Sequence, residues 1–326
     1  MRGTHTRRRR GVATTVIVAL LVAGVLVVSV GVLRMRGPGE ATAAPAAADP
    51  GRRPWQVTLD VDQTAGYVVT AGVTDGARQT LTVQSLGLGD DPDGTYGGEV
   101  TAFPPGTLDE RQFSTAEQVN DSWYLAGFTF AGHATGDAEP WQGPAVGRRD
   151  PSGIWIVVYA DTDRADGKIG RPDLFRLAAA ARLGPPRDLR LPLRLGRTLP
   201  KGLELTYVRS PDQRIDRRQA AVGFSAPARR PSAAAVYTGL PPELDVAVLT
   251  GARDAAWTRT RGTLTGQTRI AGLPAWYEPG TRLIVEAERC VVTVRSALPR
   301  ADLTGLVENL TIGDCADPDS WIPPLS

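Results

Sequence analysis

Histidine, cysteine and lysine are scarce in this chain of 326 residues, which has two histidines, two cysteines and two lysines, Lys168 and Lys201. His5 lies in the N-terminal tail, so His133 is the only histidine in the rest of the chain. A zinc site built from several histidines is therefore excluded within one chain. A Ser-His-Asp triad would have to use His133, but no G-x-S-x-G stretch supplies an activated serine.

Glycine-rich nucleotide motifs are missing as well. No G-x-G-x-x-G or G-x-x-x-x-G-K-[ST] stretch follows a strand-like run. Two of the many acidic residues could converge as they do in a glycosidase, but the sequence does not select the pair. We therefore expect a protein that is not an enzyme and has no cofactor, and an exported carboxylate-dependent hydrolase is the alternative.

Positive charge is concentrated at the N-terminus. The first 53 residues hold nine of the 37 basic side chains and two of the 35 acidic ones, so residues 54–326 carry 28 basic against 33 acidic side chains, a net charge of −5. Nucleic acids require a positive footprint on the protein that binds them. Nucleic acid is therefore excluded as a partner of this acidic body.

One long apolar run is present near the N-terminus, "RRRRGVATTVIVALLVAGVLVVSVGVLRMR", with no charge between Arg10 and Arg34. Residues 12–33 as a helix reach about 33 Å, which spans a bilayer. The four arginines at positions 7–10 favour a cytoplasmic N-terminus. We predict a cytoplasmic tail over 1–11, a transmembrane helix over 12–33 and a disordered linker over 34–53. The protein is then a single-pass protein of the cell membrane whose C-terminal domain is extracellular.

A cleaved signal peptide is the alternative for this segment, because the small residues of "ATAAPAAADP" (41–50) suit a signal peptidase. The apolar core is longer than the usual 7–15 residues of a signal peptide, and the small residues lie well beyond its end. We therefore favour an uncleaved anchor. An exported domain with two cysteines predicts one disulfide, between Cys290 and Cys315.

The exterior part of the sequence repeats itself. Five stretches recur in the same order: 79–87 as 219–227, 98–109 as 234–245, 119–124 as 273–277, 155–160 as 290–295, and 172–184 as 301–313. The separations drift between about 129 and 153 residues, so insertions are needed. We predict two tandem related units, 54–186 and 192–326, joined by the proline-rich link "GPPRDLRLPLRLG" (184–196).

Each unit is predicted to be an α+β unit, an antiparallel sheet covered by one C-terminal helix. Runs such as "WQVTLDVD", "TLTVQS", "RLIVEAE" and "VVTVRS" alternate with the two-residue period of half-buried strands. The closing helices have apolar residues at i, i+3, i+4 and i+7, which are Leu174, Leu177, Ala178 and Ala181 in the first unit and Leu303, Leu306, Val307 and Leu310 in the second. Asp173 and Asp302 would cap the helix starts, and Gly184 and Gly313 would end the helices.

The stretch "DTDRADGKIGRPDLF" (161–175) resembles half of a calcium loop. With Gly167 at position 6, Asp166 takes position 5, Ile169 position 8 and Asp173 position 12. Arg164 falls on a ligand position, so a one-residue bulge is needed to bring Asp161 and Asp163 to the ion. The calcium ligands would be Asp161, Asp163, Asp166 and Asp173. An acidic turn before a capped helix explains the same residues without an ion, and we favour it.

A long insertion in the first unit, 130–151, is the candidate binding loop, with His133, Asp137, Glu139 and Trp141. Binding residues tend to gather on long loops of a rigid scaffold, although many such loops bind nothing.

The run "LPAWYEPGTRLIVEAERCVVTVRSALPRADLTGLVENLTI" (273–312) resembles a unit of exported domains in actinobacterial envelope proteins. Some of those domains are attached to anti-sigma factors or have half-barrel, lipoprotein-carrier-like folds. The resemblance covers about an eighth of the chain and implies an extracytoplasmic α+β domain. This chain departs from the sensor pattern, because we expect no cytoplasmic regulatory domain before its membrane helix. We predict a non-catalytic module that binds an envelope protein, a polymer or an apolar ligand. A calcium-stabilised structural spacer is a further alternative.

Overall fold

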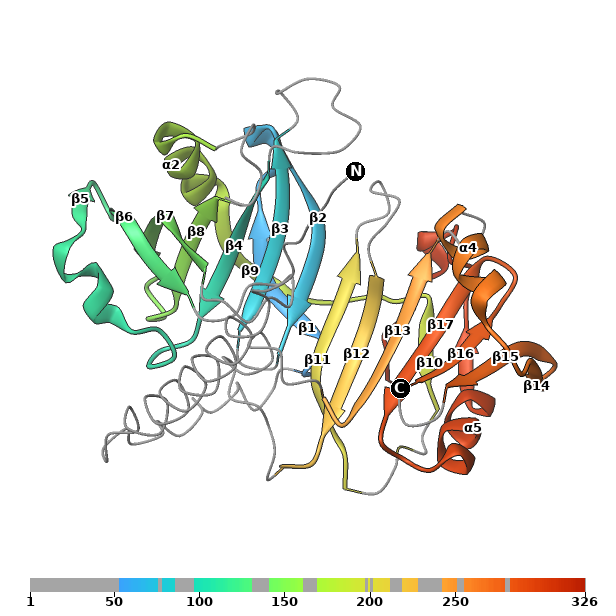
Figure 1. Ribbon diagram of the computed structural model, residues 1–326. Coiled ribbons are helices and arrows are strands. Elements are labelled where there is room, and N and C mark those ends of the chain that lie inside the picture. The colour runs from blue at the N-terminus through green and yellow to red at the C-terminus, as the bar shows by residue number, and fades with distance from the viewer. Residues whose placement is uncertain are drawn as a thin grey trace, which may run out of the picture. The chain divides into compact units, whose positions relative to one another are not determined.

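Antiparallel strands make up most of the structure, a computed structural model (Figure 1). It describes residues 53–75, 78–85, 97–130, 141–160, 169–196, 199, 202–211, 219–227, 242–250, 255–278 and 282–325. The chain divides into a unit of residues 1–44, which lies outside those ranges, and a unit of residues 45–326. No helix in the described ranges is both long and apolar enough to cross a membrane.

One antiparallel sheet of fourteen strands runs through the described part of residues 45–326. In the first half of the chain its strands are β2 (Tyr67–Thr74), β3 (Gln79–Ser85), β4 (Gly97–Phe103), β5 (Glu117–Val119), β6 (Ser122–Phe130), β7 (Trp141–Arg149) and β8 (Trp155–Ala160). In the second half they are β11 (Glu204–Pro211), β12 (Gln219–Ser225), β13 (Leu244–Thr250), β14 (Thr268–Ile270), β15 (Leu273–Glu278), β16 (Arg282–Glu286) and β17 (Cys290–Ser296). The prediction of antiparallel strands with few helices is confirmed, but the two predicted sheets are joined into one.

The strand order is the same in both halves. The order is β2-β3-β4-β8-β7-β6-β5 in the first and β11-β12-β13-β17-β16-β15-β14 in the second, and the two first strands, β2 and β11, pair antiparallel where the halves meet. Because equivalent strands pair antiparallel within one sheet, the halves are related by a pseudo-two-fold axis, as in an isologous dimer interface. Both halves therefore present the same sheet face to the same side.

The smaller elements also recur in order. Helix α2 (Arg171–Ala180) leads into β9 (Ala181–Asp188), which pairs with β1 (Gln56–Val61). Helix α5 (Arg300–Glu308) leads into β18 (Leu310–Ile312), which pairs with β10 (Leu193–Leu195). A helical insertion follows the third strand of each sheet: the 3-10 helix η2 (Glu110–Thr115) in the first half and α4 (Ala255–Thr263) in the second. Short 3-10 turns η1 (Gln63–Ala65) and η4 (Pro318–Ser320) complete the described elements.

Even a side-chain contact is repeated. The guanidinium of Arg171, at the first position of α2, lies 4.3 Å from the ring centroid of Tyr124 on β6. The guanidinium of Arg300, at the first position of α5, lies 5.1 Å from the ring centroid of Tyr277 on β15. In both halves a cation–π contact therefore fixes the start of the closing helix to the strand beneath it.

The repeated stretches of the sequence fall on equivalent elements in four of the five matches. The exception is the match of 98–109 with 234–245, which is wrong: the counterpart of β4 is β13, which begins only at Leu244. The two stretches share a proline pair, but this pair follows β4 in the first half and precedes β13 in the second.

The predicted helix faces are correct in their first three positions, but the residues at the fourth, Ala181 and Leu310, lie in β9 and β18, and the predicted helix ends are wrong. Leu174, Leu177 and Ala178 of α2 are buried, as are Leu303, Leu306 and Val307 of α5. Gly184 does not end a helix, because α2 stops at Ala180 and Gly184 lies in β9. Gly313 likewise follows β18 rather than α5. In each half the chain leaves the helix early to hydrogen-bond with another strand.

Residues 184–196 are not a free link between two units. Leu189, Leu191, Leu193 and Leu195 alternate along this segment, and all four are buried in the core of the second half. Strand β1 is shared in the same way, since Trp55 and Val57 pack in the core of the second half and Leu59 and Val61 in that of the first. The two halves therefore share core-forming segments.

The predicted disulfide is present. Cys290 on β17 is bonded to Cys315 in the segment after β18, with their Cα atoms 5.7 Å apart. It ties the sheet of the second half to the C-terminal segment.

Candidate functional site

The predicted calcium loop is only partly visible. Asp161, Asp163 and Asp166 lie outside the described residues, and Asp173 lies in the first turn of α2. Its Oδ2 accepts a hydrogen bond from the Gly170 amide at 3.1 Å, and its Oδ1 forms an ion pair with Arg176. Asp173 thus caps the helix start, as its position in the sequence indicates. Within the described ranges no three His, Cys, Asp or Glu side chains gather as a metal site.

The candidate binding loop 130–151 is not a loop throughout. Trp141 begins β7, where it is paired with Phe130 of β6, and the strand continues to Arg149. His133, Asp137 and Glu139 lie outside the described residues. A binding role for these four residues stays a prediction.

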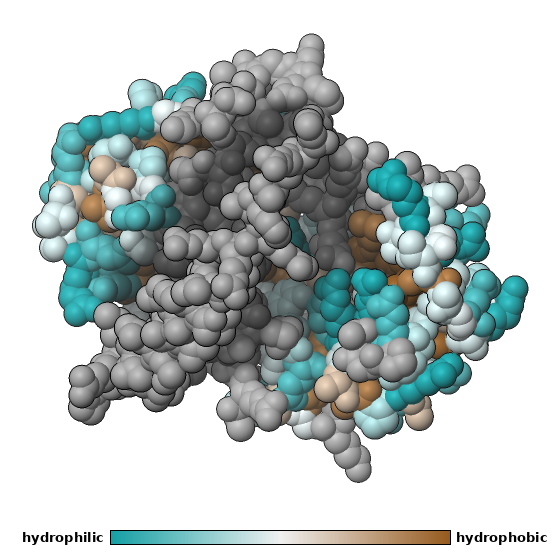
Figure 2. Space-filling model, in the orientation of Figure 1, coloured by the Kyte–Doolittle hydropathy of each residue, from teal (hydrophilic) through white to brown (hydrophobic). Residues whose placement is uncertain are grey.

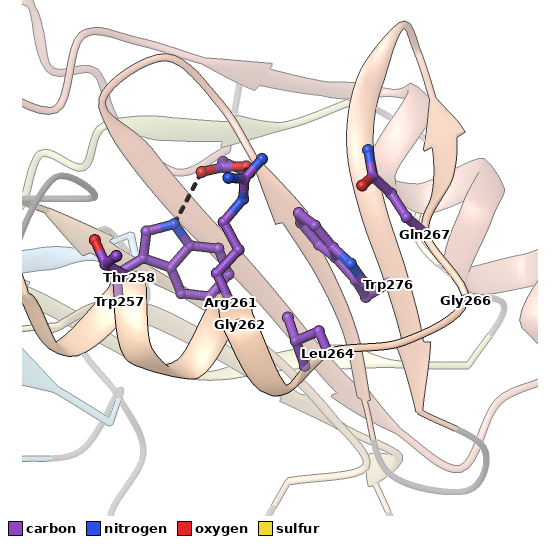
Figure 3. Close-up of a pocket in the computed structure, with 9 residues that line it drawn as sticks. Trp257, Thr258, Arg261, Gly262, Leu264, Gly266, Gln267 and Trp276 are labelled. Carbon is purple, nitrogen blue, oxygen red and sulfur yellow. Dashed lines mark hydrogen bonds and ion pairs between the residues drawn. The ribbon is translucent and has the colours of Figure 1, made fainter.

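A pocket of about 670 Å³ lies between α4, the turn that follows it, and strands β15 and β16 (Figure 3). Its lining residues are Trp257, Thr258, Arg261, Gly262, Leu264, Gly266, Gln267, Trp276 and Glu286. Figure 3 shows Trp257, Arg261 and Trp276 side by side, with Gln267 across the pocket from α4. On the face seen in Figure 2, hydrophobic residues reach the surface beside the α4 region.

Glu286 holds α4 against the sheet. Its Oε1 accepts a hydrogen bond from the indole nitrogen of Trp257 at 2.9 Å, and its Oε2 pairs with Nε of Arg261 at 2.9 Å. The indoles of Trp257 and Trp276 meet edge to face with centroids 6.0 Å apart. These contacts order the pocket wall before any ligand arrives, which lowers the entropic cost of binding.

The equivalent place in the first half is filled. There Phe113 of η2 stacks on Trp155 of β8 with centroids 4.8 Å apart. Gly147 makes room for it, because a Cβ at that position would lie 2.6 Å from the Phe113 ring. By strand register, Ile284 stands where Gly147 does and Val291 where Trp155 does. The second half therefore anchors its insertion with Trp257, which packs with Ile284 and Val291, and has a pocket beside this anchor.

On the sheet face that carries the pocket, the third strand of each half holds a buried carboxyl, Glu99 on β4 and Asp245 on β13. In the first half the Tyr159 hydroxyl donates to Glu99 Oε2 at 2.7 Å, and Thr101 and Thr80 extend the network. In the second half the Tyr207 hydroxyl donates to Asp245 Oδ1 at 2.5 Å, and Arg295 lies 3.5 Å from Oδ2. Burial raises the pKa of Asp245, although Tyr207 and Arg295 act in the opposite direction. Both carboxyls thus form hydrogen bonds or ion pairs with side chains of the protein itself.

Sequence reasoning did not identify the pocket. Trp257 and Arg261 stand four residues apart in "AAWTRTRGT" and so share one helix face. That spacing was the available signal, but their partners Trp276 and Glu286 come from two strands whose pairing the local sequence does not reveal.

No protein-family model and no curated protein matches this chain. Among solved structures it is similar to the MucA/MucB complex of Pseudomonas aeruginosa, at 13% identity over 79% of this chain and 93% of that chain, with a TM-score of 0.19. It is also similar to a crystal structure of MucB in complex with MucA(peri), at 12% identity over 77% of this chain and 95% of that chain, with a TM-score of 0.20. At these identities and TM-scores neither likeness supports a conclusion about this chain.

Proposed function

We propose that this protein is a non-catalytic binding protein of the cell exterior, held at the membrane by residues 12–33, and that its binding site is the pocket beside α4. The observation that carries the proposal is the pocket itself: a space of about 670 Å³ walled by Trp257, Trp276 and Leu264 and edged by polar side chains. Small-molecule sites have this size and this mixture of apolar walls with a few polar groups.

The order of the pocket wall supports the same proposal. Trp257 and Trp276 are almost fully buried, at 5% and 3% exposure, so they form a fixed base rather than mobile surface groups. Gln267 and Gly262 are exposed, which leaves the rim open to solvent.

The test is to block the pocket without touching the core. A Cβ added at Gly262 in α4 meets no atom within 4 Å, so Gly262→Phe can project its ring over the pocket rim. Gly305 in α5 is an equally open helical glycine, and Gly305→Phe is the matched control. Binding of naphthalene-1-acetamide to the full chain in lipid nanodiscs is measured by ligand-observed NMR, with empty nanodiscs as the blank.

The expected result is binding by the unmodified chain and by Gly305→Phe, and at least a tenfold weaker affinity for Gly262→Phe. Absence of binding, or equal affinity in both variants, would overturn the assignment of the site.

The membrane anchor has its own test. We expect the full chain to remain with membranes after an alkaline wash and to retain its first residues in a mass measurement. A mature chain beginning within or just after residues 41–50 would establish the cleaved signal peptide instead.

A further inference from the structure

Resting on the proposed function, we infer that the pocket beside α4 binds a planar apolar group that carries a carboxylate.

Both carboxylate oxygens of Glu286 are already engaged within the protein. Glu286 uses Oε1 for the Trp257 indole and Oε2 for Arg261, and its side chain is only 21% exposed. A cationic ligand group would therefore compete with Arg261, which already lies 2.9 Å from Oε2 of Glu286.

The guanidinium of Arg261 still has N–H donors available for a ligand. A guanidinium carries five N–H donors, and the ion pair of Arg261 with Glu286 engages Nε. Its side chain is 49% exposed, so the terminal nitrogens are open to a ligand. Arginine prefers a planar carboxylate that accepts two hydrogen bonds from its fork. The pocket thus offers a charged donor without a matching acceptor.

The position of Arg261 ties the anionic group to an apolar one. Its guanidinium carbon lies 5.7 Å from the centre of the Trp276 ring. A carboxylate one or two bonds away from an aromatic ring therefore reaches Arg261 while the ring lies over Leu264 and the small exposed part of Trp276. A small inorganic anion would lack the second contact, and a plain hydrocarbon would lack the first.

The glycines at the rim admit a flat body. A Cβ at Gly262 or at Gly266 would meet nothing within 4 Å, so both positions border open space. Gly266 also has φ of +69°, a conformation that a glycine adopts without strain. The turn can thus pass the pocket without a side chain across its entrance.

The experiment compares two probes of the same shape and nearly the same size, the anionic naphthalene-1-acetate and the neutral naphthalene-1-acetamide. Both are titrated by ligand-observed NMR into the full chain in nanodiscs. We expect the acid to bind about fivefold more tightly than the amide, the size of a partly exposed charge-assisted contact.

Arg261→Gln should bring the acid to the affinity of the amide and leave the amide unchanged. Arg259→Gln, on the same helix and also exposed, should change neither probe. Equal affinity of acid and amide for the unmodified chain, with both probes excluded by Gly262→Phe, would overturn the carboxylate inference and leave the proposed site intact. Failure of both probes to bind would overturn the site itself.

The same carboxylate can belong to a free acid or to the end of a peptide. A peptide ending in tryptophan, Ala-Ala-Ala-Trp, is therefore titrated with a free and with an amidated C-terminus. Tighter binding of the free peptide than of naphthalene-1-acetate indicates a C-terminal residue as the ligand, and weaker binding indicates a small acid.

Discussion

Asp245 is a buried carboxyl in the second half of the sheet. It is 8% exposed, accepts a hydrogen bond from Tyr207 at 2.5 Å and lies 3.5 Å from a nitrogen of Arg295. Gly223 allows the Tyr207 ring to lie across the sheet, because a Cβ there would come within 2.1 Å of it. Burial and then the nearby Asp245 carboxylate raise the pKa of Tyr207 well above its usual range, so it stays a hydrogen-bond donor.

Tyr207→Phe should lower the free energy of unfolding by about 1.5–3 kcal/mol at pH 7, because a buried carboxylate loses a hydrogen bond that water cannot replace. Chemical denaturation of the full chain measures the change. Tyr277→Phe is the control, since the Tyr277 ring keeps its contact with Arg300 in the variant. An equal, small loss in both variants would contradict the role given to the Tyr207 hydroxyl.

Because the pKa of Asp245 is raised on folding, its contribution to the free energy of unfolding changes with pH in one direction. Between the ordinary carboxyl pKa of about 4 and the raised folded-state pKa, the folded protein binds more protons than the unfolded chain. The contribution of Asp245 to stability therefore falls as the pH rises through this window. Asp245→Asn removes that contribution, so the unfolding free energy of the variant minus that of the unmodified protein should increase between pH 4 and pH 7.

Taking this difference removes the opposing effect of Asp109, Asp150 and Glu117, whose pKa values are lowered by hydrogen bonds and which remain in both proteins. A difference that is constant with pH would show that Asp245 titrates as in the unfolded chain.

At the scale of elements, each half ends in a helix followed directly by a strand, and these helices differ in what secures them. Helix α5 and β18 are closed by the disulfide from β17 to the C-terminal segment. Helix α2 has the Asp173 cap at its start, whereas the cation–π contact, of Arg171 or of Arg300, is common to both helices.

Reduction of the disulfide should cost about 3 kcal/mol, because the cross-link closes a sequence separation of 25 residues in the unfolded chain. For a domain of this size that is a fall in Tm of roughly 6–12 °C, seen in melting curves with and without reductant. A Cys290→Ser/Cys315→Ser double variant should melt at the lower temperature in both conditions. A Tm of the unmodified protein that ignores reductant would contradict this role.

If calcium binds at 161–173, the melting temperature of the protein should rise when calcium is added. An ion at about 100 times its Kd would add about 2.7 kcal/mol, and Asp166→Ala would abolish the shift. The favoured interpretation, an acidic turn before a helix capped by Asp173, predicts identical curves in calcium and in chelator. The Asp173 contacts with Gly170 and Arg176 agree with this interpretation without testing the ion.

At the scale of the whole molecule, the two halves are related as the subunits of a dimer but share core-forming segments. Strand β1 and residues 189–195 carry apolar side chains that pack in the second half, and β1 also packs in the first. The β2–β11 pairing continues the sheet from one half to the other. Residues 45–326 accordingly form one compact unit.

We therefore expect the halves to unfold together. Trp55→Ala leaves a cavity in the core of the second half, and Leu59→Ala leaves one in the core of the first. Each substitution should lower the free energy of unfolding by about 3–5 kcal/mol at most, and both lie in or next to β1. Each variant should shift a single thermal transition of the chain, monitored by calorimetry. Two transitions, of which each variant shifts only one, would show that the halves fold independently.

The local sequence determined the parts of the fold that depend on neighbours along the chain. Alternation predicted β1, β3, β16 and β17, and the three-and-four spacing predicted the buried faces of α2 and α5, because a strand or helix must bury the residues that its own period brings to one side. The pairing of Cys290 with Cys315 followed from the cysteine count. The recurrence of similar stretches indicated two related halves with the same order of elements.

The tertiary structure alone decided how these elements are shared. Residues 184–196, read as a link because of their prolines, form β9 and β10 because distant strands β1 and β18 offer them hydrogen bonds. The pocket likewise exists because strand pairing brings Trp276 and Glu286 beneath Trp257 and Arg261. Such contacts depend on pairing between residues far apart in the chain, and a local period carries no information about which distant partner a strand will find.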